Sequence, residues 1–332
     1  MTLGARFESE IREQPAVWRR VAASDQAQRL AAAIAGRDVL FVGSGSSLFV
    51  ALLGALAFRR RGVRAAALAA TEARFDNAAY RDACVVALSQ SGRSSDLLGA
   101  LDDFVPDACV ALTNDVRSPL AERAAVVVDA LAGVEVAVPA SKSVTAMAAI
   151  VLWAAAIAGG RTHRSAATLE RTADDVRDWL DGRGVDDVRE AAQRLAGCRG
   201  VAVAGAGYGV PVALEVALKV KEASYVHAEG FAAGEFRHGS SAMLDPSSAI
   251  VGIVDAASRP IVARPLAEAE SAGALRFAIG GEAAGVAPLG PRTAEPFNTL
   301  AWLVAGQMLA LAVGRANGVD SDAPRGLRKY VL

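Results

Sequence analysis

The sequence contains little cysteine, almost no net charge and no apolar run long enough to cross a membrane. Its formal net charge is −1 at pH 7, which argues against a nucleic-acid-binding protein, because such proteins carry a basic face. The longest uninterrupted apolar run, 146–158, is shorter than the roughly 20 residues of a membrane-spanning helix. The first residues lack the apolar core of a signal peptide. We therefore expect neither a membrane span nor a nucleic-acid partner.

The three cysteines are spread along the chain. Cys84 and Cys109 fall within predicted strands, and Cys198 lies just before another. None belongs to a CxxC pair or to a cluster with metal-ligand spacing. We expect core thiols in a reducing compartment, the cytoplasm, and no bound metal.

Hydrophobic residues make up 53% of the 332 residues, so the chain is long and apolar enough for the cores of two domains. Short apolar runs alternate with helical segments, which is typical of a mostly parallel sheet covered by helices on both faces. We predict an α/β protein with a first lobe over 1–160 and a second over 161–332, which begins with charged connector helices. The expected strands are 38–42, 64–69, 84–88, 109–112 and 125–129 in the first lobe and 200–204, 249–254 and 275–279 in the second, with long helices at 143–159 and 299–315.

Both predicted lobes begin alike, with an apolar strand, a glycine-rich turn and a helix. The turns are 43–47 and 205–209, and this similarity indicates an internal repeat of one α/β unit. The first turn is rich in serine and the second is not. We expect the first lobe to bind the ligand and the second to contribute catalytic groups.

Two serine-rich turns, 43–47 and 89–95, follow strands of the first lobe and precede helices. Backbone N–H groups and the helix dipole at such a turn attract an anion, and serine hydroxyls add donors. Helix capping by serine is the alternative explanation for each turn alone. Two turns at the carboxyl ends of neighbouring strands favour one phosphate-sized anion site. The chain lacks the GxxxxGK[ST] pattern of a nucleotide P-loop and the third glycine of a dinucleotide-binding turn.

The stretch 211–239 combines a mostly apolar helix with a polar loop. In the helix, Glu215, Lys219 and Glu222 are spaced by four and three residues and therefore share one stripe. The loop after Tyr225 contains several glycines together with two histidines and two glutamates, namely His227, Glu229, Glu235 and His238. This pattern is typical both of the wall and rim of a catalytic pocket and of an ion-paired structural helix followed by an ordinary polar loop, and the stretch alone does not decide between them.

Five motifs together resemble the sugar isomerase (SIS) superfamily. They are SQSGRSSDLL at 89–98, TNDVRSPLAERA at 113–124, AGVEVAVPASKSVTA at 132–146, ALEVALKVKEASYVHAEGFAAGEFRHG at 213–239 and DAPRGLRKYVL at 322–332. The chain is most similar to the isomerase half of glucosamine-6-phosphate synthase and to stand-alone sugar-phosphate deaminases and deglycases. The resemblance covers nearly the whole chain and implies two tandem SIS-type lobes.

The resemblance also implies roles for individual residues. Glu222 matches the base that moves a proton between C1 and C2, with Lys219 beside it. His238 matches the residue that assists ring opening and that the neighbouring subunit supplies, so a homodimer is implied. Lys329 matches the lysine that reaches the open-chain carbonyl. The matched phosphate-binding residues are Ser46, Ser47, Ser89, Gln90, Ser91 and Ser94, and Val138, Ala140 and Ser141 match the segment that lines the sugar.

The implied activity is conversion of glucosamine 6-phosphate to fructose 6-phosphate and ammonia, without a metal or redox cofactor. A fructosamine-6-phosphate deglycase and a plain aldose–ketose phosphosugar isomerase remain alternatives. A further alternative is a sensor that binds sugar phosphates without turnover, although the presence of Glu222, His238 and Lys329 together argues against it. No cysteine precedes Cys84 in this sequence and no part of it matches the glutaminase half of the synthase, so we expect no glutamine-dependent synthesis from this chain alone. The family's Gly-Pro after the histidine is replaced by Gly239-Ser240-Ser241, which changes the expected shape of the rim.

Overall fold

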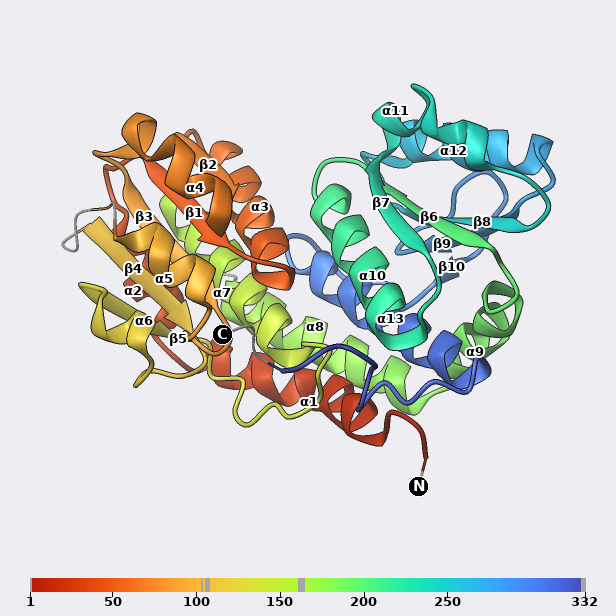
Figure 1. Cartoon of the computed structure of the whole chain (residues 1–332), viewed down its shortest axis with the longest axis horizontal. Helices are drawn as coiled ribbons and strands as arrows, with labels where there is room; N and C mark the ends of the chain where they lie inside the picture. Colours follow the sequence, from red (N-terminus) through yellow and green to blue (C-terminus); the bar gives the residue numbers. More distant parts are fainter. Residues whose placement is uncertain (1, 103, 105–107, 161–164, 330–332) are drawn as a thin grey trace. The chain divides into compact units, whose positions relative to one another are not determined.

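The computed structural model describes residues 2–102, 104, 108–160 and 165–329. The chain forms two compact units, each with one sheet (Figure 1). The sheet-1 unit consists of Gln14–Glu135, Lys142–Arg171 and Arg328–Leu332, and the sheet-2 unit consists of Met1–Glu13, Val136–Ser141 and Thr172–Leu327. The α/β class and the two parallel sheets flanked by helices are as predicted. The predicted domain division at residue 160 stays a prediction.

The sheet-1 unit has five strands in the order β2-β1-β3-β4-β5, and all pairings are parallel. Every residue of β1, β3 and β4 is buried, as expected of strands covered on both faces. The strands are β1 Val39–Gly43, β2 Ala65–Ala69, β3 Cys84–Ser89, β4 Cys109–Thr113 and β5 Val126–Asp129. The helices lying wholly in this unit are α2 Gln26–Ala33, α3 Ser46–Arg59, α4 Ala70–Asp76, α5 Ser95–Leu101, α6 Pro119–Glu122 and α7 Lys142–Ala158, with the 3₁₀ turn η1 Asn77–Tyr80.

Close packing of α3 against α7 depends on Gly54. A Cβ atom at this position would lie 2.7 Å from Val151 Cγ1 and 3.1 Å from the ring of Phe41. The helix α7 is buried along almost its whole length, which explains the long apolar run in the sequence. Cys84 and Cys109 are buried on neighbouring strands, in agreement with core thiols.

The sheet-2 unit has five parallel strands in the order β10-β9-β8-β6-β7. Read from the edge strand β7, this is the strand order of the first sheet, so the internal repeat is confirmed at the level of topology. The strands are β6 Gly200–Gly205, β7 Ala228–Ala232, β8 Ser248–Ile253, β9 Leu275–Ile279 and β10 Pro288–Leu289. The helical elements lying wholly in this unit are α9 Gly184–Leu195, α10 Gly209–Ser224, α11 Ala233–Phe236, η3 Ser240–Met243, α12 Arg259–Ser271 and α13 Asn298–Ala316; two further helices are α1 Ala5–Ala22 and α8 Ser165–Asp181.

The loop predicted after Tyr225 is partly wrong, because its first half forms the strand β7. This strand pairs in parallel with β6 over five residues. Gly230 allows the strand to lie directly against α10, since a Cβ there would be 2.6 Å from Leu214 Cα. The glycines of this stretch therefore permit close packing and are not only turn signals.

One described helix, α13, is long and apolar enough to cross a membrane. Its most apolar window is 83% buried inside the protein, and it packs against α10 and α9. Such burial is what a central core helix requires, so α13 is accounted for by the fold.

Candidate functional site

The two serine turns lie at the same edge of the first sheet. The strands β1 and β3 are parallel neighbours, and the turns 43–47 and 89–95 follow their carboxyl ends. Gly45 occupies the N-cap position of α3 with φ of 55°, so Ser46 and Ser47 form the first helical turn. Ser47 N already donates to Ser44 O, so a ligand at this edge could use only those backbone N–H groups of the two turns that are not engaged, and the anion site stays a prediction.

Helix capping does not account for all of these serines. Ser94 occupies the N-cap position of α5, but its hydroxyl makes no capping bond. Within the described part of the chain, the hydroxyls of Ser46 and Ser94 form no hydrogen bond. Ser89 Oγ accepts a bond from Gly92 N at 3.0 Å, and Ser91 Oγ accepts one from Arg93 N at 3.2 Å. Ser89 and Ser91 therefore fix the turn, while Ser46 and Ser94 keep donors for a ligand.

A buried carboxylate that sequence analysis did not single out lies beside Lys329. The Glu135 side chain is fully buried, and its Oε2 accepts bonds from Ser143 Oγ at 2.7 Å and from Lys329 Nζ at 3.1 Å. The Glu135 Oε1 atom accepts a bond from Ser143 N at 3.1 Å. The signal in the sequence is a single acidic residue inside the apolar part of the motif AGVEVAVPASKSVTA. This carboxylate fixes the ammonium group that the family resemblance assigns to the open-chain carbonyl.

The C-terminal tail before Lys329 is tied to other parts of the sheet-2 unit. Asp320 accepts a hydrogen bond from Gly4 N at 2.9 Å, and Asp322 accepts one from Phe7 N at 2.8 Å. The backbone N–H of Arg325 donates to the hydroxyl of Tyr225 at 2.6 Å. The guanidinium group of Arg325 lies 4.5 Å from the centre of the same ring. The chain is therefore held in place until four residues before Lys329.

The charged stripe of α10 forms a network around Lys219. Lys219 Nζ lies 2.5 Å from Glu222 Oε2 and 3.6 Å from Glu215 Oε1. The side chains of Lys219 and Glu215 are each 1% exposed, whereas that of Glu222 is 21% exposed. One ammonium group thus offsets the repulsion between two carboxylates, and only Glu222 among the three is accessible to a small molecule.

His238 is exposed in the turn after α11. Its backbone N–H donates to Glu235 O at 2.9 Å, and the described contacts include no hydrogen bond between the His238 and Glu222 side chains. Gly239 follows with φ of 116°, a conformation that favours glycine, and leads into the 3₁₀ turn η3. Ser240 and Ser241 therefore start a short helical turn where the family has proline.

The segment Val136–Ser141, which contains the predicted sugar-lining residues, is held by a buried glutamate. Glu10 Oε1 accepts bonds from Val136 N at 2.5 Å and from Ala137 N at 3.2 Å. Ser141 is fully buried and its carbonyl oxygen lies 3.5 Å from Gln307 Nε2. Val138 and Ala140 are half-buried, so their side chains stay partly accessible.

The sequence model of the SIS domain matches residues 35–158 and 194–284, one segment for each sheet. The chain belongs to the SIS domain family. Its SIS relatives include a glutamine–fructose-6-phosphate aminotransferase (isomerizing) of Pyrobaculum aerophilum, 30% identical over 97% of this chain and 56% of the relative. A relative of the same name from Mycolicibacterium smegmatis is 33% identical over 76% of this chain and 43% of its own length. The chain spans about half the length of these relatives.

Solved structures with the same SIS fold include stand-alone proteins. A protein described as a putative phosphosugar isomerase from Silicibacter pomeroyi is 28% identical, with a TM-score of 0.79 over 96% of this chain and 99% of that one. A glucosamine-6-phosphate deaminase of Thermotoga maritima is 22% identical, with a TM-score of 0.80 over 98% of this chain and 99% of that one. The second likeness concerns the fold alone.

Within each unit, the structure therefore groups some of the predicted SIS site residues. The sheet-1 unit holds the serine turns together with Lys329, and the sheet-2 unit holds Lys219, Glu222, His238 and the segment Val136–Ser141. The Lys219–Glu222 contact is present as predicted. The joining of both groups into one active site stays a prediction, as do the roles of the individual residues.

Proposed function

We propose that this chain is a phosphosugar isomerase that acts most readily as a glucosamine-6-phosphate deaminase. The observation that carries this proposal is the network on α10, where a buried ammonium group holds a partly exposed carboxylate. A purely structural ion pair needs no exposed member, whereas a base that takes a proton from a bound sugar does. The family membership and the serine turns with two uncommitted hydroxyls support a phosphorylated substrate.

Catalysis would begin with an opened sugar ring. The phosphate is bound by the backbone N–H groups of the two turns and by the hydroxyls of Ser46 and Ser94. The imidazole of His238 moves the proton of the anomeric hydroxyl to the ring oxygen, which gives the open-chain aldehyde. The ammonium group of Lys329 donates a hydrogen bond to the aldehyde oxygen, where negative charge develops in the next step.

The carboxylate of Glu222 then takes the proton from C2 and returns it to C1. On a 2-amino sugar one proton also passes from the amino nitrogen to O1, so the product is an imine at C2 with a hydroxyl group at C1. Water adds to that carbon, and the C–N bond breaks to leave fructose 6-phosphate and ammonia. Lys219 keeps the Glu222 carboxylate oriented through the short contact between Nζ and Oε2.

We further propose that the active unit is a homodimer, because the family resemblance implies that His238 serves the active site of the neighbouring subunit. The exposed position of His238 and the lack of a hydrogen bond to Glu222 within the described chain are compatible with this sharing.

A panel of substrates tests the reaction. The full chain is incubated separately with glucosamine 6-phosphate, a fructosamine 6-phosphate and glucose 6-phosphate, and ammonia, free amino acid and ketose phosphate are measured. Ammonia and fructose 6-phosphate in equal amounts are the expected result. Release of the amino acid from the second compound would instead make the chain a deglycase, and a ketose phosphate from the third alone would make it a plain isomerase. Tight binding without any turnover would reject the enzyme proposal in favour of a sensor.

A further inference from the structure

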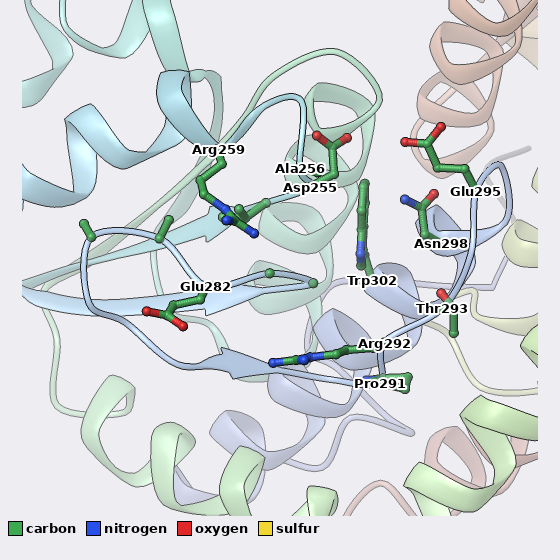
Figure 2. A pocket seen from close by; sticks show the side chains of 15 residues that line it. Asp255, Ala256, Arg259, Glu282, Pro291, Arg292, Thr293, Glu295, Asn298 and Trp302 are labelled. Carbon is green, nitrogen blue, oxygen red and sulfur yellow. The ribbon is translucent and has the colours of Figure 1, made fainter.

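A cavity of about 560 Å³ opens in the sheet-2 unit at the carboxyl ends of β8 and β9 (Figure 2). Its polar and aromatic lining includes Asp255, Arg259, Glu282, Arg292, Asn298 and Trp302. None of the residues that we assign to the reaction lines this cavity. Open parallel sheets bind ligands at the carboxyl ends of their strands, and the volume is in the usual range of small-molecule pockets. The second sheet therefore has a ligand-sized cavity of its own.

Three hydrogen-bonding groups in this cavity have no partner within the described chain. Asn298 is only 7% exposed, and its Oδ1 accepts a bond from Thr299 N at 3.0 Å while its Nδ2 makes none. Trp302 is 4% exposed, and its indole N–H makes no hydrogen bond. Thr293 Oγ1 is buried and also unpaired. Figure 2 shows the Asn298 amide nitrogen directed toward Trp302. Of the three atoms only Thr293 Oγ1 is itself buried, and buried polar groups are rarely left unpaired, whereas the other two groups border the cavity and stay free to donate to a ligand.

Two arginines reach into the same cavity from different segments. Arg259 starts α12, and Arg292 lies in the segment that leads to α13. Neither forms an ion pair with a described residue, although Glu282 and Glu295 line the same space. In Figure 2 their guanidinium groups extend into the cavity from above and below. The helices α12 and α13 both begin at this cavity, and the positive end of each helix dipole adds positive electrostatic potential there. Guanidinium groups recognise phosphate and carboxylate through paired hydrogen bonds, and phosphate, with more oxygen atoms and more charge, can accept such bonds from two arginines at once.

The remaining lining decides what else the ligand carries. Asp255 is engaged by the backbone N–H of Ser258, but Glu282 and Glu295 offer carboxylates that repel a bare anion and accept bonds from hydroxyl groups. Trp302 forms a fixed wall, since a Cβ on Gly280 would lie 2.4 Å from its Nε1. An apolar ring face with hydroxyls at its edge matches this combination. We propose that the cavity binds a phosphorylated sugar as a second ligand, which goes beyond the proposed reaction and does not depend on it.

The test counts binding sites with a ligand that cannot react. Glucitol 6-phosphate has no carbonyl group, and its binding to the full chain is measured by titration calorimetry. We expect two molecules per chain. Arg259→Met and Arg292→Met should each weaken one of the two by about tenfold or more, because each removes hydrogen bonds to a charged group. Arg264→Met is the matched control, since Arg264 is an exposed arginine on α12 outside the cavity and should leave both affinities unchanged.

The outcomes separate this proposal from the proposed function. If only one molecule of glucitol 6-phosphate binds per chain and its affinity depends on Arg259, the proposal of a ligand site in this cavity is supported. The proposal that the serine turns bind phosphate is then rejected. Sites that no cavity arginine affects overturn the proposal. Inorganic phosphate that binds as tightly as glucitol 6-phosphate at the Arg259 site overturns the sugar part of it. Asn298→Asp is a second variant, in which a carboxylate replaces the side-chain amide. The lost N–H donor and the added negative charge should weaken binding of glucitol 6-phosphate at the same site by a similar factor. Thermal melting of each variant ensures that only folded protein is compared.

Discussion

The replacement Glu222→Gln separates a catalytic carboxylate from a structural one. Glutamine keeps the volume of the side chain and can still accept a hydrogen bond from Lys219. The Lys219 ammonium also retains Glu215, whose Oε1 lies 3.6 Å away. Because Glu222 is 21% exposed, we expect the free energy of unfolding to fall by only about 1 kcal/mol. For a chain of 332 residues that corresponds to a shift in Tm of roughly 1–2 °C.

Turnover should respond far more strongly than stability. A positioned general base contributes about 10²–10⁴-fold to a rate, so kcat of Glu222→Gln should fall by that factor. Glu215→Gln is the matched control on the same stripe, because Glu215 is 1% exposed and out of reach of substrate. We expect this control to retain most of its turnover. Lys219→Met should be the most destabilised of the three, by about 3–5 kcal/mol, since it removes the charge that two carboxylates share.

The measurement that isolates the base is exchange of the C2 proton of glucosamine 6-phosphate with deuterated solvent, followed by NMR. The wild type and Glu215→Gln should catalyse this exchange, and Glu222→Gln should not. Exchange at the wild-type rate in Glu222→Gln would refute the assignment of the base, whatever happens to ammonia release. A large drop in Tm without loss of exchange would show that the network is structural.

Three other predictions concern different parts of the chain. The double variant Ser46→Ala, Ser94→Ala should raise KM with little change in Tm, because each lost hydrogen bond to a phosphate is worth about 1.5–3 kcal/mol; an unchanged KM would contradict the phosphate site. Mixing inactive Glu222→Gln with inactive His238→Ala protein should restore partial activity if subunits share the active site, and no recovery after demonstrated subunit exchange would count against sharing. Burial raises the pKa of Cys109 to about 12, so its thiol should stay unreactive toward a disulfide reagent at pH 8 until denaturant is added.

The alternation of strands and helices could be predicted from the sequence because it depends on local patterns. Apolar runs of five or six residues became β1, β3, β4, β6 and β8, and the serine turns follow the strands expected. The strand β7 was not predicted, because Gly230 and its small neighbours read as a loop until α10 lies against them. The pair formed by Glu135 and Lys329 was also missed, since 194 positions separate the two residues and no local pattern connects them.

Asp320 and Asp322 accept hydrogen bonds from the backbone N–H groups of Gly4 and Phe7, so the two ends of the described chain depend on each other. An alteration near residue 4 therefore acts on the tail that carries Lys329, at the opposite end of the sequence. A purification tag that disturbs the first turn of α1 would leave two aspartates without their amide donors and loosen the tail. The activity measured on a tagged protein would then be lowered by the loosened tail and would not be that of the native chain. Tag-free protein is therefore the proper reference for every assay above.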